Sequence, residues 1–226
     1  MDAVIKVGGS LAEDPEKLRA LCQKLGELAK KYAFIVVPGG GGFADVVRVF
    51  DDRFALSRTV SHRMAILAMD QFGLLLSSIT PHSNVFHSLE SAKELSEAGA
   101  MPIFLPSRLL FEDDPLENSW DVTSDSIAAY VASRVHAEKL VLVTDVDGVF
   151  TGDPKKKCSA KLIERLSAEQ LIKLNQRTSV DRYLPKLLLD AKFDCYVVNG
   201  FLAERVEAVL ASLLTTCTFV ASRPEQ

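Results

Sequence analysis

Val4-Ile5-Lys6-Val7-Gly8-Gly9-Ser10-Leu11 is the stretch that decides the fold of this chain. Apolar residues run directly into two glycines and a serine, which is typical of a short buried strand that ends in a tight turn. Glycine has no Cβ, so the backbone of such a turn can approach a ligand, and its N–H groups can cradle an anion such as a phosphate. Lys6 would place an ammonium group over the same anion. Taken alone, the stretch is explained equally well by an ordinary strand and turn.

A second strand, glycine turn and helix follow the first unit closely. Phe34-Ile35-Val36-Val37 has the pattern of a buried strand, Gly39-Gly40-Gly41-Gly42 that of a turn, and 43–50 that of a helix. Two such units in succession are the signature of a parallel sheet. Ligands bind these sheets beyond the carboxyl ends of the strands. Both glycine turns are therefore expected to face one crevice.

Helix and strand patterns alternate through the rest of the chain. Helices are expected at 15–28, 58–78, 91–98, 124–135, 168–174, 184–189 and from 203, and strands at 84–86, 102–106, 140–143, 194–198 and 218–220. The acidic segment 111–118 has the character of a loop, where the chain crosses into its second half. These patterns predict an α/β protein, a three-layer α/β/α sandwich with a mostly parallel central sheet.

Composition excludes several classes of function. The net charge of −4 over 226 residues disfavours general nucleic-acid binding, and no apolar run reaches membrane-spanning length. The N-terminus lacks the basic head of a signal peptide. The four cysteines are scattered without a C-x-x-C pair, which argues against a zinc site or a disulfide framework; they are Cys22, Cys158, Cys195 and Cys217. A reducing, cytoplasmic location is therefore expected.

Five motifs fall in a characteristic order and spacing. They are Lys6-Val7-Gly8-Gly9-Ser10, Gly39-Gly40-Gly41-Gly42, Asp121-Val122-Thr123-Ser124-Asp125, Thr144-Asp145-Val146-Asp147-Gly148-Val149 and Pro185-Lys186. Together they resemble the amino-acid kinase family, which includes acetylglutamate, aspartate, uridylate and isopentenyl-phosphate kinases. The resemblance covers essentially the whole chain, 1–226, as a single domain. It implies an ATP-dependent kinase whose Mg²⁺ is carried by the ATP phosphates, with no metal ligand assigned to a protein side chain.

The resemblance implies three catalytic residues. Lys6 would stabilise the transferring phosphoryl group, and Lys186 would neutralise the nucleotide phosphates. Asp125 would lie between the two lysines, where a carboxylate keeps both ammonium groups charged and in place. Phosphoryl transfer depends on such charge neutralisation and positioning more than on covalent chemistry. Taken singly, Asp125 is also explained as a helix-start carboxylate and Lys186 as a solvated helix lysine.

The resemblance also divides the chain between two ligands. A carboxyl lobe, 118–226, would bind ATP, and an amino lobe, 1–117, would bind the acceptor. The implied nucleotide-binding residues are Gly8, Gly9, Ser10, Thr144, Asp145, Asp147, Gly148, Val149, Asp153 and Pro154. The second glycine turn, with Gly39, Gly40 and Gly41, would bind the acceptor and aim its N–H groups at developing negative charge.

Three stretches point to one group of enzymes within the larger family. They are 39–48, 61–71 and 180–186, and they resemble the small aspartokinase-like kinases of methanofuran biosynthesis. Those enzymes occur in methanogens and methylotrophic bacteria and convert an aminomethylfuran phosphate to the diphosphate. Thr178-Ser179-Val180-Asp181-Arg182-Tyr183-Leu184 stands where many members of the larger family carry a Gly-Gly-Met run.

Positive side chains near the second glycine turn fit a phosphorylated acceptor. Arg58 and His62 are four residues apart on one expected helix and so share a face. Arg48 follows the glycines by about one helical turn. Such donors suit a phosphate monoester, and Asp45 or Asp70 would receive an amine. Surface ion pairs explain the same residues equally well.

Two alternatives remain open. One is another acceptor, such as isopentenyl phosphate or a carboxylate; few long apolar residues follow the glycine turn, which disfavours an isoprenoid tail. The other is a non-catalytic nucleotide-binding or storage protein on the same fold, against which the presence of both Lys6 and Lys186 argues. The expected helix 58–78 carries more apolar surface than one core face needs. With the family's habit of pairing subunits through this helix, that surface predicts a homo-oligomer.

Overall fold

The computed structural model describes residues 1–157, 159–174 and 179–221. Its sheet is built from the strands β1 (Ala3–Val7), β2 (Phe34–Pro38), β3 (Ser83–Phe86), β4 (Met101–Phe104), β5 (Lys139–Thr144), β8 (Arg165–Ser167), β9 (Asp194–Asn199) and β10 (Thr218–Ala221). The described part of the chain adds a separate hairpin of β6 (Val149–Phe150) and β7 (Leu162–Ile163).

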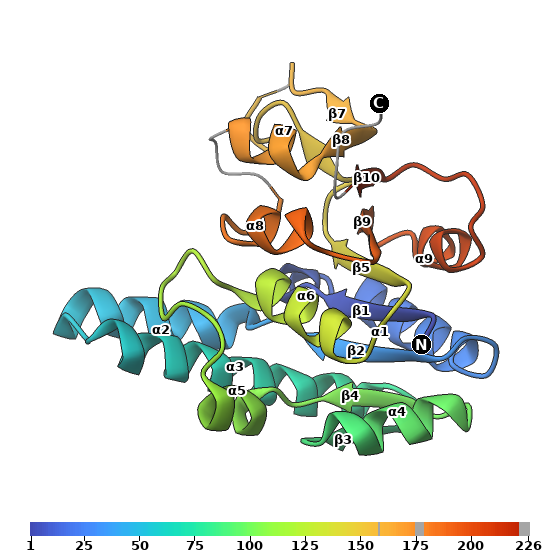
Figure 1. Ribbon diagram of the computed structural model, residues 1–226, viewed down its shortest axis with the longest axis horizontal. Coiled ribbons are helices and arrows are strands. Elements are labelled where there is room, and N and C mark those ends of the chain that lie inside the picture. The colour runs from blue at the N-terminus through green and yellow to red at the C-terminus, as the bar shows by residue number, and fades with distance from the viewer. Residues whose placement is uncertain (158, 175–178, 222–226) are drawn as a thin grey trace.

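Helices flank this sheet on both faces (Figure 1). They are the 3₁₀ helix η1 (Gly9–Glu13) and the α-helices α1 (Pro15–Leu28), α2 (Gly41–Phe54), α3 (Arg58–Ile79), α4 (Leu89–Glu97), α5 (Ser107–Asp113), α6 (Ser124–Arg134), α7 (Ala168–Lys173), α8 (Leu184–Leu189) and α9 (Ala203–Leu210). The strand order is β3-β4-β2-β1-β5-β9-β10-β8. Neighbouring strands are parallel except that β10 runs antiparallel to β9. The predicted α/β/α sandwich with a mostly parallel sheet is confirmed.

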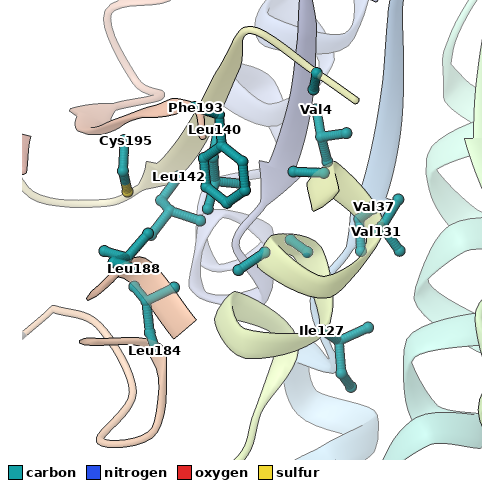
Figure 2. Close-up of a cluster of buried hydrophobic side chains, with 14 of the residues drawn as sticks. Val4, Val37, Ile127, Val131, Leu140, Leu142, Leu184, Leu188, Phe193 and Cys195 are labelled. Atoms are coloured by element: carbon teal, nitrogen blue, oxygen red, sulfur yellow. The ribbon is translucent and has the colours of Figure 1, made fainter. Parts of the chain in front are cut away.

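Two apolar cores lie on the two faces of the sheet. Every residue of β1 and β2 is buried, as expected for central parallel strands covered on both faces. Figure 2 shows one core, where strand side chains meet helices α6 and α8; its labelled members include Val4, Val37, Leu140, Leu142, Ile127, Val131, Leu184 and Leu188. The other core packs the opposite face against α1, α9 and part of α3, through residues such as Leu21, Leu25, Phe72 and Val206.

The register of the central strands brings both glycine turns to one edge. Val7 pairs with Pro38 of β2 and with Val143 of β5, so all three strands end at the same level. The turns touch, because a Cβ built on Gly9 would lie 2.1 Å from the backbone nitrogen of Gly41. No other residue type fits at Gly9 without moving the second turn. The prediction that both turns face one crevice is confirmed.

Several local predictions need correction. The segment 111–118 is not wholly a loop, because α5 continues to Asp113 with Leu110 buried in the core, and it ends at Asp114 in a left-handed conformation. Strands β6, β7 and β8 were not predicted, since two or three residues are too short to show a period. Cys22, Cys195 and Cys217 are free thiols, and Cys158 lies outside the described residues. Among the helices of the described residues, none is both long and apolar enough to cross a membrane.

Candidate active site

A cavity of about 860 Å³ opens at the carboxyl edge of β1, β2 and β5. This volume is in the range of sites that bind small molecules. Fourteen of the predicted site residues line it: Lys6, Gly8, Gly9, Ser10, Gly40, Gly41, Asp45, Arg48, His62, Thr144, Asp145, Gly148, Asp153 and Pro154. The structure therefore brings the two glycine turns, the opening lysine and the turn after β5 to one place.

A buried ion pair lies at this edge of the sheet. The Lys6 ammonium, on β1, is 2.7 Å from Oδ1 of Asp125, in the first turn of α6. Burial raises the pKa of Asp125 above its ordinary value; the Lys6 charge opposes this shift, and the nearby Asp181 carboxylate adds to it. Lys6 lines the cavity while Asp125 stands behind it. The pair fixes one positive charge at the cavity wall.

Asp181 ties this ion pair to helix α8. Its Oδ2 accepts hydrogen bonds from the backbone N–H groups of Thr123 and Ser126, both at 2.9 Å, and its Oδ1 accepts one from Leu184 at 2.7 Å. One carboxylate thus satisfies the open N–H groups at the starts of α6 and α8. The Asp181 N–H donates to Oδ2 of Asp125 at 3.0 Å. Sequence reasoning gave Asp181 no role, because its partners are distant in the chain.

A second ion pair lies near the predicted nucleotide residues. Asp145, directly after β5, accepts a short hydrogen bond from the Lys155 ammonium. Burial works against ionisation of Asp145, but Lys155, helped by Ser10, outweighs it and lowers the pKa of Asp145. Lys155 and Lys156 both line the cavity. Sequence reasoning missed both lysines, although they directly follow the predicted turn 151–154.

Two predicted nucleotide residues shape the turn from outside the cavity. Oδ1 of Asp147 accepts hydrogen bonds from Arg205 at 2.6 Å and from Asn199 at 2.9 Å. Val149 is buried in β6, and its N–H donates to Oγ1 of Thr218 at 2.8 Å. Neither residue is among the described residues that line the cavity. Both hold the turn between β5 and β6 in place.

Some of the residues that were predicted to bind the acceptor, on α2 and α3, line the cavity and others do not. Arg48 and His62 line the cavity, and the Arg48 guanidinium lies over the Trp120 ring, 4.0 Å from its centroid. His62 is buried, and burial lowers its pKa even though Asp114 and a hydrogen bond to the Ser119 backbone act in the opposite direction. The imidazole is therefore neutral at pH 7. Trp120 was not among the predicted site residues.

Three residues that were predicted to contact the acceptor do not line the cavity. Arg58 is the first residue of α3 and is exposed, outside the cavity. Gly39 donates its N–H to the Val7 carbonyl at 2.8 Å and supports the turn from behind. Asp70 accepts a hydrogen bond from the Ser107 N–H at 3.3 Å, so it contacts α5. Spacing had put Arg58 and His62 on one helical face, but it does not set how far along the helix the cavity extends.

Lys186 also lies outside the cavity. It is exposed on α8, with its ammonium 5.0 Å from the centre of the Tyr183 ring. Asp125 was expected to lie between two lysines. Its Oδ1 contacts Lys6 as expected, but its Oδ2 accepts the Asp181 N–H in place of a second lysine. Residue Thr178 of the stretch before Lys186 lies outside the described residues.

The chain is similar in sequence to a known family and to several named proteins. The model of the Amino acid kinase family matches residues 1–191. A [5-(aminomethyl)furan-3-yl]methyl phosphate kinase of Methanocaldococcus jannaschii is 36% identical over 208 residues, covering 92% of each chain. A uridylate kinase of Archaeoglobus fulgidus is 27% identical, over 96% of this chain and 99% of the relative.

Solved structures show the same likeness. The crystal structure of uridylate kinase from Archaeoglobus fulgidus matches with a TM-score of 0.76 at 25% identity, covering 98% of this chain and 100% of the other. The UMP kinase from Ureaplasma parvum matches with a TM-score of 0.76 at 21% identity, over 98% of each chain, which supports the fold.

Proposed function

Because the chain belongs to the amino acid kinase family, we propose that it transfers the γ-phosphoryl group of ATP to a phosphate monoester and makes a diphosphate. The chain is a phosphotransferase, as its named relatives are kinases. The observation that carries the proposal is the buried Lys6–Asp125 pair at a cavity that both glycine turns line. The proposed acceptor is an aminomethylfuran phosphate, named for the relative that is 36% identical.

The reaction is a displacement at the γ-phosphorus. An oxygen of the acceptor phosphate forms the new P–O bond, the bond to the β–γ bridging oxygen breaks, and ADP leaves with that electron pair. Two anionic phosphates must approach each other, and their repulsion opposes the reaction. The Lys6 ammonium, held at the cavity wall by Asp125, offsets this charge where it is greatest.

We assign the nucleotide to the turns around β1 and β5. The Gly8–Gly9 turn suits the β- and γ-phosphates through the Gly9 N–H, while the Gly8 N–H donates to the Val143 carbonyl at 2.8 Å and fixes the turn to β5. Lys155 and Lys156 also line this cavity. The residues present therefore fit a nucleoside triphosphate. Mg²⁺, carried by the ATP phosphates, would supply further neutralisation of their charge. In this assignment the lobe 118–226 binds most of the nucleotide, and the lobe 1–117 contributes Gly8 and Gly9.

We assign the acceptor to the second glycine turn and to α2, within the lobe 1–117. Helix α2 begins at Gly41, so its open N–H groups and the positive end of its dipole favour an anion there. Arg48 adds a fixed positive charge on the same helix, and His62 lines the same part of the cavity. Asp45, which also lines the cavity, is suited to receive the acceptor's amine.

UMP is a second candidate acceptor. Uridylate kinases match over nearly the whole chain, and UMP is also a phosphate monoester that would give a diphosphate. The anion-binding features of α2 suit either molecule. Isopentenyl phosphate and carboxylates are further candidates. Apolar side chains such as Ile66, Met69 and Ile127 also line the cavity and would suit an isoprenoid tail.

We further propose that the protein is a homo-oligomer. Helices α2 and α3 lie side by side (Figure 1), and both expose large apolar side chains to solvent. They are Phe43, Val46, Val49, Phe50, Phe54, Val60, Leu67 and Leu74, called here the α2–α3 apolar surface. Large apolar side chains exposed on two neighbouring helices are typical of contacts between subunits.

A panel of acceptors tests the proposed function. The protein is incubated with ATP, Mg²⁺ and, separately, aminomethylfuran phosphate, UMP, isopentenyl phosphate and N-acetylglutamate, and ADP release is followed. The proposal expects the highest kcat/KM for aminomethylfuran phosphate. A higher kcat/KM for UMP would select the second candidate, and turnover of N-acetylglutamate alone would overturn the phosphate-monoester class. ADP release that is independent of every acceptor would exclude a kinase of these substrates.

A further inference from the structure

We propose that Trp120 is a positioning residue for acceptor binding, which holds the Arg48 guanidinium in place for the acceptor phosphate. The inference rests on the proposed function and extends it to a residue outside the recognised motifs. Trp120 lies in the segment between α5 and α6, whereas Arg48 lies in the middle of α2. Both line the acceptor side of the cavity.

Contact between Trp120 and Arg48 is direct. The guanidinium carbon lies 4.0 Å from the centroid of the indole ring, well within the range in which a cation is attracted to an aromatic face. A guanidinium stacked in this way points its N–H groups outward along the edge of its plane, and this edge is the one that binds a phosphate. Arg48 is also paired with Asp45, whose Oδ1 lies 4.0 Å from Nε of Arg48.

Trp120 is itself anchored to the helix that carries Arg48. Its indole N–H donates to Oδ2 of Asp51 at 2.6 Å. Arg48 and Asp51 are three residues apart on α2, so they lie on one face. The indole therefore bridges two consecutive turns of α2: its N–H binds one charged side chain and its ring face binds the other.

The same segment also contacts the second polar side chain of the acceptor side. The His62 ring is hydrogen-bonded to the backbone of Ser119, the residue before Trp120. Two adjacent residues thus hold Arg48 and His62, which come from α2 and α3. An arginine side chain loses much rotamer freedom when it binds a ligand, so holding it beforehand lowers the entropic cost of binding.

A comparison of the acceptor KM with the ATP KM distinguishes this positioning role from a structural one. The variants are Trp120→Ala, which removes the ring, Trp120→Phe, which keeps a ring face but loses the N–H, and Arg53→Ala, an exposed arginine on α2 outside the cavity. With aminomethylfuran phosphate, Trp120→Ala is expected to raise the acceptor KM about tenfold and leave the ATP KM within about twofold. Trp120→Phe should recover most of the acceptor affinity, and Arg53→Ala should match the wild type.

Fluorescence gives an independent readout, because Trp120 is the only tryptophan of the chain. Acceptor titrated into the wild type should change the emission and saturate, and the same titration into Arg48→Ala should lose most of that affinity. An acceptor KM that is unchanged in Trp120→Ala, or acceptor and ATP KM values that rise equally, would overturn the inference. So would wild-type emission that stays constant at saturating acceptor. A wild type that turns over no phosphate monoester overturns the proposed function instead, before any variant is compared.

Discussion

The Lys6 ammonium lies 2.7 Å from Oδ1 of Asp125, and the two side chains are only 11% and 7% exposed. This pair joins the first strand of the sheet to the start of α6, more than half the chain later. Removal of either partner would leave an uncompensated buried charge, which is strongly unfavourable. The pair therefore gives the Lys6 ammonium a fixed position beside both glycine turns.

Lys186 is predicted to act on the ATP phosphates even though it is exposed on α8. Its long stem can swing toward a bound nucleotide, and the resemblance to the family assigns it that role. Lys186→Ala should keep the fold and lower kcat by about 10²–10³. Lys192→Ala, also exposed and outside the cavity, is the control and should behave as the wild type. Equal turnover by the two variants at saturating ATP would remove Lys186 from the mechanism.

Arg48 and Arg58 are predicted to differ, although both were expected at the acceptor. Arg48 lines the cavity and Arg58 does not. Loss of a charged hydrogen-bond donor to the acceptor phosphate should raise the acceptor KM of Arg48→Ala about tenfold to a hundredfold. Arg58→Ala should leave both KM values unchanged. The measurement is a full set of initial rates in acceptor and ATP; an effect of Arg58→Ala on the acceptor alone would show that the cavity extends further along α3.

His62 is predicted to make stability depend on pH. Burial lowers its pKa below the ordinary 6.5, so between those two values the unfolded chain binds more protons than the folded one. The contribution of neutral His62 to the free energy of unfolding should therefore be complete above about pH 6.5. It should be lost as the pH falls through the lowered pKa.

Urea unfolding from pH 8 to pH 5 measures this dependence. His62→Gln should show a flatter profile than the wild type over the acidic part of the range. His136→Asn is the control, since His136 is exposed and has a left-handed backbone that asparagine tolerates. Parallel wild-type and His62→Gln profiles would show that His62 does not titrate differently in the folded state.

The α2–α3 apolar surface is predicted to join subunits. Leu74 is 54% exposed there, while Leu214 is fully exposed elsewhere. Leu74→Glu should shift the protein toward monomers in light scattering at micromolar concentration, because a carboxylate is costly to bury in an apolar contact. Leu214→Glu should leave the oligomer intact. A monomeric wild type would refute the oligomer itself.

Features with strong periodicity or special backbone needs could be predicted from the sequence. The expected helix 58–78 is α3, Arg58–Ile79. The two glycine turns were predictable as neighbours because buried parallel strands end at one edge, and the near-contact of Gly9 and Gly41 explains why glycine occupies both. Lys6 and Asp125 were identified by family resemblance, and the structure pairs them.

What was missed depends on contacts between distant, irregular segments. Trp120 binds Asp51, and Asp181 binds Thr123, and neither pairing has a periodic signal in the sequence. Arg58 lies outside the cavity for a related reason: helical spacing indicates the face of a residue but not its distance from the cavity.

Transfer of label from [γ-³²P]ATP to aminomethylfuran phosphate, compared between the wild type and Lys6→Ala, tests the central claim most directly. The account predicts that the wild type places the label in the terminal phosphoryl group of a diphosphate, one per ADP formed. Lys6→Ala should lose stability in urea unfolding, because Asp125 is left unpaired, but remain folded without urea and form that product about 10²–10³ more slowly. Label recovered only as inorganic phosphate, or a diphosphate formed equally fast by Lys6→Ala, would contradict the account.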